Sequence, residues 1–164
     1  MTRRTPEAAL YCVMGIDPSL VSTGVVVIHP QDNVFHAAIK IKAGEEITQR
    51  IDKIAWEVME LVSLHRPDLI VIEGLAMGGI RGNTYLDLAG LHHVIRRDLI
   101  NQRIEVVPPT ALKKFVTGRG NTKKDQMRLA VYKKWGVEFL TTDETDAYAL
   151  AQWGQALLAA KIVP

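Results

Sequence analysis

A run of four apolar residues without alternation, Leu69–Ile72, constrains the fold of this chain more than any other feature. A strand that is apolar on both faces must be covered on both sides, as in the interior of a mixed or parallel sheet. Before it, apolar residues recur at helical spacing from Ile47 to Val62, which predicts a helix that ends before Pro67. A helix that leads into a buried strand predicts a crossover in an α/β sheet.

The segments on either side complete this sheet. Residues 11–16 and 25–28 are apolar and β-branched with turn signals between them, so they predict a first pair of strands, and 34–42 predicts a third. The later elements expected are a helix over 83–102, a strand over 104–107, a short helix over 110–116, a helix from 121 or 122 to 135, and a last helix from 141 or 142 to about 160. We therefore expect an α/β fold with a mixed five-stranded sheet, three antiparallel strands first and parallel crossovers after, flanked by helices.

Size and composition indicate one domain. With 164 residues, 48% of them hydrophobic, the whole chain (1–164) has the dimensions of a single domain with its own core, and residues 1–9 are expected to be flexible. Those first residues lack the apolar core of a signal peptide, and no apolar run approaches the roughly 20 residues of a membrane span. We expect a cytoplasmic protein without membrane contact. Cys12 lies in an apolar run, which favours a small buried side chain over a catalytic thiol or metal ligand.

Acidic residues stand at the ends of two predicted strands. Asp17 follows the first strand, and Glu73 closes the strand of 69–72. In open α/β sheets, sites form at the carboxyl ends of strands, so two neighbouring central strands could present both acids together. Taken alone, each has an ordinary explanation: Asp17 as a turn former before Pro18, and Glu73 as a strand-end charge in solvent.

A second acidic pair opens the last predicted helix. Asp143 and Asp146 are three residues apart, which places both on one helical face, and Thr141 with Glu144 matches a capping box. Stabilisation of a helix start, about 0.3–1 kcal/mol, explains this pair alone equally well. Four acids in one place would repel each other without a cation, and ligands that are all oxygen select Mg²⁺, with Mn²⁺ as a substitute. We therefore expect a hard-metal site suited to phosphodiester hydrolysis.

A basic segment runs from Lys113 to Lys134. The net charge of +2 is too small to indicate a polyanionic partner, but this segment holds eight basic residues against one acid, Asp125. We expect it to bind DNA, and the residues assigned to this role are Lys113, Lys114, Arg119, Lys123, Lys124 and Arg128.

Three motifs, in this order, resemble the RuvC-type Holliday-junction resolvases. The string Gly15-Ile16-Asp17-Pro18-Ser19, followed by Thr23-Gly24, is similar to the first-strand motif of that family. Ile72-Glu73 closes a strand as the family's second acid does, and Asp143-Glu144-Thr145-Asp146-Ala147 resembles its final D-x-x-D-A motif. Each motif is weak alone, but their order and spacing are specific, and the resemblance covers roughly residues 11–157.

The resemblance implies an RNase H-like fold, a homodimer, and Mg²⁺-dependent paired nicking of four-way DNA junctions that leaves 5′-phosphate and 3′-hydroxyl ends. It also implies that the four acids, Asp17, Glu73, Asp143 and Asp146, are catalytic metal ligands. Residues 120–126 resemble the family's lysine-bearing stretch before a helix, with Lys124 the better match and Lys113 matching an upstream lysine. We expect Lys124 to contact the scissile phosphate or to stabilise charge in the transition state, the alternative being a solvated lysine at a helix start.

Two departures from the family pattern stand near the acids. Ser19 replaces the usual glycine, and Gly74-Leu75-Ala76-Met77 lacks the aromatic residue that family members carry there, thought to probe the open junction. Junction opening and sequence preference could therefore differ, as they also do among short phage-encoded relatives. Gly78 and Gly79 suggest a loop that closes over DNA or a plain turn. His92 and His93 are expected at the core edge or an interface rather than as ligands; Trp135 and Trp153 are expected in the core.

Three other functions share some of these sequence features. Actin-like and sugar-kinase-type ATPases open with a similar Asp-plus-turn strand pair, but they need two such domains and this chain supplies one, so no nucleotide cofactor is expected. An RNase H-like nuclease that acts on flaps, forks or structured RNA keeps the same fold and stays open as an alternative. A non-catalytic DNA-binding protein is disfavoured because all four acids are present.

Overall fold

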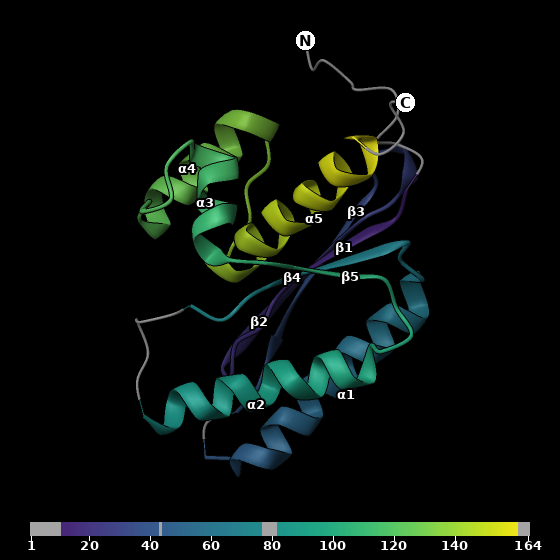
Figure 1. Ribbon diagram of the computed structural model, residues 1–164, viewed down its shortest axis with the longest axis vertical. Coiled ribbons are helices and arrows are strands. Elements are labelled where there is room, and N and C mark those ends of the chain that lie inside the picture. Colours follow the sequence, from purple (N-terminus) through teal and green to yellow (C-terminus); the bar gives the residue numbers. More distant parts are fainter. Residues whose placement is uncertain (1–10, 43, 77–81, 161–164) are drawn as a thin grey trace.

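The computed structural model describes residues 11–42, 44–76 and 82–160, which form one sheet with helices on both faces (Figure 1). The elements in chain order are β1 (Val13–Asp17), β2 (Ser22–Ile28), the short 3-10 helix η2 (Pro30–Asp32), β3 (Val34–Lys40), α1 (Ile47–His65), β4 (Leu69–Glu73), α2 (Asn83–Asp98), β5 (Ile104–Val107), α3 (Pro109–Thr117), α4 (Lys124–Trp135) and α5 (Thr142–Ala160). No helix in these ranges is both long enough and apolar enough to cross a bilayer.

The sheet confirms the expected mixed topology. Its strand order is β3-β2-β1-β4-β5, with β1, β2 and β3 antiparallel and both β4 and β5 parallel to β1. In the parallel register Ile16 pairs with Ile72, so the residues that follow them, Asp17 and Glu73, end neighbouring strands at the same edge of the sheet.

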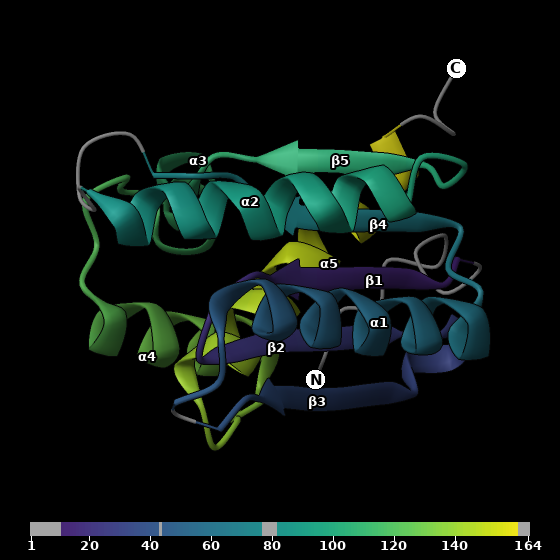
Figure 2. The ribbon, with the colours of Figure 1, turned by 90° about the horizontal axis from the view of Figure 1, so that it is seen from below.

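Each face of the sheet has its own core layer. Figure 2 shows α1 and α2 on one face and α5 on the other. Ile70 and Ile72 pack toward α1 and α2, whereas Leu69 and Val71 pack with α3, α4 and α5. Both faces of β4 are buried, which explains the apolar run without alternation.

Helix α5 lies in direct backbone contact with the strands. A Cβ atom added at Gly15 would stand 2.0 Å from the carbonyl oxygen of Ala147, and one added at Gly24 would stand 2.2 Å from that of Asp143. On the helix itself, a Cβ at Gly154 would lie 2.5 Å from the Val13 side chain. No other residue type fits these three positions without movement, so the glycines set how closely α5 approaches β1 and β2.

Several predicted boundaries shift. The helix expected over 83–102 ends at Asp98, and the chain turns at Leu99, whose carbonyl accepts a hydrogen bond from the Gln102 N–H. The cap expected at Asn121 or Thr122 was wrong, because α4 begins at Lys124 and the Thr122 hydroxyl instead donates to the Arg119 carbonyl. The predicted end at residue 135 is confirmed, and Gly136 after it has a left-handed φ of 72°. Cys12 is buried, also as expected.

Because α5 approaches the sheet closely, alanine should destabilise the protein at a glycine in this contact and not at a glycine elsewhere. Gly24→Ala should lower the free energy of unfolding by about 1–3 kcal/mol, because the new methyl group meets the backbone of Asp143 and the helix must shift. Urea denaturation followed by circular dichroism measures this loss.

Gly90→Ala in α2 is the matched control. Its new Cβ would meet only the Ile51 side chain, at 3.5 Å, and alanine favours a helix interior by roughly 0.5–1 kcal/mol, so this variant should be neutral or slightly more stable. Equal destabilisation by the two substitutions would contradict the tight contact between α5 and the sheet.

Candidate active site

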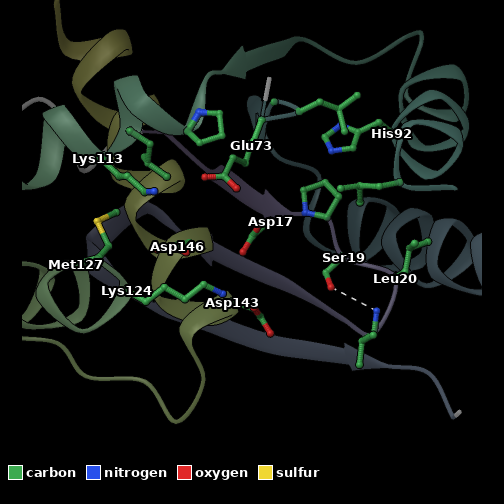
Figure 3. Close-up of a pocket in the computed structure, with 18 of the residues that line it drawn as sticks. Asp17, Ser19, Leu20, Glu73, His92, Lys113, Lys124, Met127, Asp143 and Asp146 are labelled. Carbon is green, nitrogen blue, oxygen red and sulfur yellow. Dashed lines mark hydrogen bonds between the residues drawn. The ribbon is translucent and has the colours of Figure 1, made fainter. Parts of the chain in front are cut away.

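One pocket of about 400 Å³ opens where the carboxyl ends of β1 and β4 meet the start of α5. Figure 3 shows its charged side chains, which come from five different elements. They are Asp17 from β1, Glu73 from β4, Lys113 from α3, Lys124 from α4, and Asp143 and Asp146 from α5. The acids that stand far apart in the sequence therefore line one cavity, as expected.

The turn after β1 holds Asp17 at the pocket. The Ser19 backbone N–H donates to the Thr23 hydroxyl at 3.1 Å, and that hydroxyl donates to the Ser19 carbonyl at 2.8 Å. The Ser19 hydroxyl in turn accepts from the backbone N–H groups of Val21 and Ser22. Ser19, which departs from the family's usual glycine, thus closes the turn with its own side chain.

The start of α5 is fixed by a cap that also reaches the edge strand. The Thr141 hydroxyl accepts from the Glu144 N–H at 3.1 Å and donates to the Glu144 carboxylate at 2.7 Å, which confirms Thr141 as the capping residue. The other carboxylate oxygen lies 2.7 Å from Nδ1 of His36 on β3. Burial alone would raise the pKa of Glu144, but the hydrogen bonds from Thr141 and His36 lower it. Nothing in the sequence links position 36 to position 144, so this contact was missed.

The acids in the pocket disfavour one another's ionisation. Burial raises the pKa of Asp17 well above its usual range, and the charges of Glu73, Asp146 and Asp143 raise it further. The interaction between the carboxyl groups of Asp17 and Glu73 also raises the pKa of Asp17, whereas it opposes the rise that burial causes in the pKa of Glu73. Burial, followed by the charge of Glu73, raises the pKa of Asp146 to about 7. The site therefore has too much negative charge for its degree of burial.

Two of the six basic residues assigned to DNA binding face this negative charge. Lys113 and Lys124 line the pocket, and their charges oppose the rise in the pKa of Glu73 and Asp146. Neither makes a salt bridge to any residue that the structure describes. Their ammonium groups therefore lie beside the carboxylates and are available to a bound anion.

The other four basic residues lie outside the pocket. Lys114, Arg119 and Lys123 are exposed on α3 and on the turn before α4. Arg128 is half-buried and donates to the Phe139 carbonyl at 2.8 Å, so it holds the chain just before α5. The role of these residues in DNA binding stays a prediction.

The acids share a pocket without forming a closed cluster. In the described ranges, no three His, Cys, Asp or Glu side chains already stand close enough together to hold a metal ion. The donor set is nevertheless all carboxylate oxygen, and the raised pKa values show that added positive charge would be favourable here. Metal binding by Asp17, Glu73, Asp143 and Asp146 stays a prediction.

His92 is a pocket residue that the sequence did not indicate. It was expected at the core edge or an interface, but the structure places it, 7% exposed, in the pocket wall that α2 provides. The sequence pattern of α2 did not indicate that His92 faces a pocket. Met77 and the Gly78-Gly79 pair lie outside the described residues.

Comparisons with known proteins relate this chain to one family of endonucleases. A family model described as crossover junction endodeoxyribonuclease RuvC matches residues 13–152. The RuvC endonuclease of Rhodopirellula baltica is 29% identical over 154 residues, covering 89% of this chain and 86% of that protein, and that of Chromohalobacter salexigens is 30% identical over 154 residues, covering 90% and 82%. The solved Thermus thermophilus RuvC in complex with a Holliday junction substrate aligns with a TM-score of 0.72 at 20% identity, covering 93% of this chain and 97% of that one. At that identity the structural likeness shows the fold.

The raised pKa of Asp146 predicts how stability depends on pH when metal is absent. Between its ordinary value of 3.8 and the folded value of about 7, the folded chain keeps a proton that the unfolded chain releases. Stability from this residue is therefore greatest at low pH and is lost as the pH rises through 7. Melting temperatures measured in EDTA from pH 5 to 8 should fall more steeply for the wild type than for Asp146→Asn.

At pH 8 the variant should melt about 2–8 °C higher, which corresponds to about 1–2 kcal/mol for a chain of this size. The difference between the two proteins reports Asp146 together with the effect of its charge on Asp17, whereas groups that do not interact with Asp146, such as His92, are common to both. If the melting temperatures of the two proteins change with pH in parallel, the pKa of Asp146 is not raised in the folded protein.

Proposed function

The chain belongs to the RuvC family of crossover junction endodeoxyribonucleases, and from this premise we propose that it resolves four-way DNA junctions by paired nicking. The products are 5′-phosphate and 3′-hydroxyl ends. The observation that carries the proposal is the single pocket that gathers four acids and two lysines at the ends of β1 and β4. Such a site suits a phosphodiester substrate, because metal-dependent hydrolysis of a phosphodiester uses water and needs no nucleophilic side chain.

The proposal includes a divalent metal ion bound by the acids of the pocket. Asp17, Glu73, Asp143 and Asp146 would hold Mg²⁺, or Mn²⁺ as a substitute, since hard cations prefer carboxylate oxygens. When bound, the metal would supply activation of water and stabilisation of the leaving oxygen. Its charge would also offset the repulsion that raises the pKa values of Asp17 and Asp146.

The protein's own cations have a separate role at the phosphate. Lys113 and Lys124 extend into the pocket beside the acids, where an ammonium group can stabilise the extra negative charge of the transition state. Exposed basic residues on α3 and before α4 continue this positive surface beyond the pocket, which suits the backbone of a DNA arm.

A homodimer suits a junction with two strands to be cut. A two-fold dimer would present two identical sites to a substrate of matching symmetry. The apolar side chains exposed on and just after α2, Leu86 at 67% and Ile100 at 77%, support an interface there.

A less selective nuclease for flaps, forks or structured RNA is the second candidate. It is favoured by one feature, because the described residues just after Glu73, from Gly74 to Ala76, include no aromatic side chain to wedge into an open junction. The two candidates share the active site and differ in substrate.

Substrate comparison separates the two candidates. With Mg²⁺, the wild type should nick a synthetic four-way junction at symmetric positions, at least tenfold faster than linear duplex, flap or fork DNA of the same sequence. Denaturing gels with each strand labelled in turn measure this. Asp146→Asn should bind the junction and fail to cut it. Equal rates on junction and duplex would exclude a resolvase and leave the nuclease.

The role of Lys124 has its own test. Lys124→Ala should lower the single-turnover nicking rate by roughly 10²–10³, because a charge that stabilises the transition state is lost, while junction affinity changes much less. Lys53→Ala is the control, since Lys53 lies on α1, on the other face of the sheet, and forms only an exposed ion pair with Glu45. If the Lys124 variant cuts at the wild-type rate, Lys124 is a solvated lysine at a helix start and has no role in catalysis.

A further inference from the structure

The two acids of α5 depend on the helix backbone for their position. Figure 3 shows Asp143 and Asp146 at the pocket, and both belong to the first turns of α5. Neither carboxylate accepts a hydrogen bond from a residue within the described part of the chain. Their placement relative to Asp17 and Glu73 is therefore set by how the first turns of the helix are held.

The contact with the sheet controls only part of this placement. A Cβ atom added at Gly24 would stand 2.2 Å from the Asp143 carbonyl oxygen, so the start of α5 meets β2 backbone against backbone. Without interlocking side chains, such a contact limits the distance of the helix more than its rotation. A side chain extends about 5–6 Å from a helix axis, so a rotation of roughly 10° moves it by ~1 Å. That shift is large for Mg²⁺, which requires near-ideal octahedral geometry at about 2.0–2.1 Å.

Glu144 links the first turn of α5 to the edge of the sheet. Successive helix residues lie about 100° apart around the axis, so Glu144 leaves the helix in a different direction from Asp143. It is 6% exposed, and its carboxylate accepts a hydrogen bond from the Thr141 hydroxyl. The other carboxylate oxygen lies 2.7 Å from Nδ1 of His36. Thr141 only precedes the helix, whereas His36 belongs to β3, so this second hydrogen bond joins α5 to a strand.

His36 is itself held in place at the surface. It pairs with Val26 of β2 in the antiparallel register, and its ring stands edge-on to Phe139 with 5.3 Å between ring centroids. Its side chain is 50% exposed, so it adds little to the core. Removing the ring should therefore leave the fold intact and change chiefly the alignment of the helix.

We propose that His36 and Glu144 are positioning residues for the metal site: the hydrogen bond between them fixes the rotation of α5 and so holds Asp143 and Asp146 in the arrangement that Mg²⁺ requires. The inference rests on the proposed function, in which the acids of the pocket bind the metal. His36 and Glu144 act through the helix backbone and do not contact the metal or the DNA.

A positioning role affects one ion more than another. Ca²⁺ accepts flexible coordination by oxygens at about 2.3–2.6 Å, whereas Mg²⁺ does not. A helix that is free to rotate should therefore bind Mg²⁺ poorly and still bind Ca²⁺. A general loss of stability would weaken the binding of both ions alike.

Calorimetric titration of the DNA-free protein with Mg²⁺ and with Ca²⁺ tests this. His36→Ala should weaken Mg²⁺ binding about tenfold, as is typical when a residue that orients metal ligands is lost, and Ca²⁺ binding by about twofold at most. His36→Asn, whose amide nitrogen can take the place of Nδ1, should restore most of the Mg²⁺ affinity. His93→Ala removes an exposed histidine outside the pocket and is the matched control.

Junction nicking supplies a second readout. In His36→Ala the Mg²⁺ concentration for half-maximal single-turnover nicking should rise about tenfold, while the rate at saturating Mg²⁺ stays within about threefold of the wild type. Glu144→Ala should shift the Mg²⁺ dependence at least as far. Adding His36→Ala to that variant should cause no further shift, because the two residues act as a pair. Circular dichroism melting of each variant separates loss of folding from loss of alignment.

The possible failures are distinguishable. If the wild type binds neither ion, or if Asp146→Asn binds both as the wild type does, the proposed metal site fails. If His36→Ala binds Mg²⁺ as tightly as the wild type, or loses affinity for Mg²⁺ and Ca²⁺ equally, the positioning role is overturned and the metal site stands.

Discussion

The backbone contact between α5 and the sheet brings the two acids of the helix to the two acids at the strand ends. Asp143 and Asp146 stand on the first turns of α5, and they reach the strand ends because Gly15 and Gly24 place no side chain between helix and sheet. A single methyl group at either glycine would push the helix outward. The same packing that completes the core on this face therefore assembles the site, and neither can vary without the other.

This arrangement carries an electrostatic cost that the fold offsets only in part. Buried carboxylates raise one another's pKa values, and the charges of Lys113 and Lys124 oppose the rise without forming ion pairs in the described ranges. Around the site, by contrast, several polar groups are paired: Thr141 and His36 hold Glu144, and Thr23 holds the turn after Asp17. The electrostatic repulsion is thus concentrated on the acids of the pocket.

Local patterns predicted the strands, the parallel crossover and the four acids, because each depends on periodicity or on the rule that strand ends form sites. Contacts between distant segments were not predictable in this way. The glycines that admit α5 look like any strand glycine until the helix is in place, and His36 meets Glu144 across 108 positions of sequence. His92 reads as a core-edge histidine because helical spacing tells which face is buried but not that a pocket lies against it. The predicted cap at Thr122 was wrong because the Thr122 hydroxyl donates to the Arg119 carbonyl and does not cap α4.

A phosphate-binding site cannot by itself make a nuclease selective for one structure. Phosphates are chemically alike along any DNA strand, so groups that contact only phosphate cannot distinguish one bond from the next. Selection among bonds must come from groups that contact something other than phosphate. One source would be the spacing and symmetry of two sites in a dimer, which would measure the shape of the junction. Another would be the apolar side chains that line the pocket beside the acids, such as Leu20, Leu88 and Leu112.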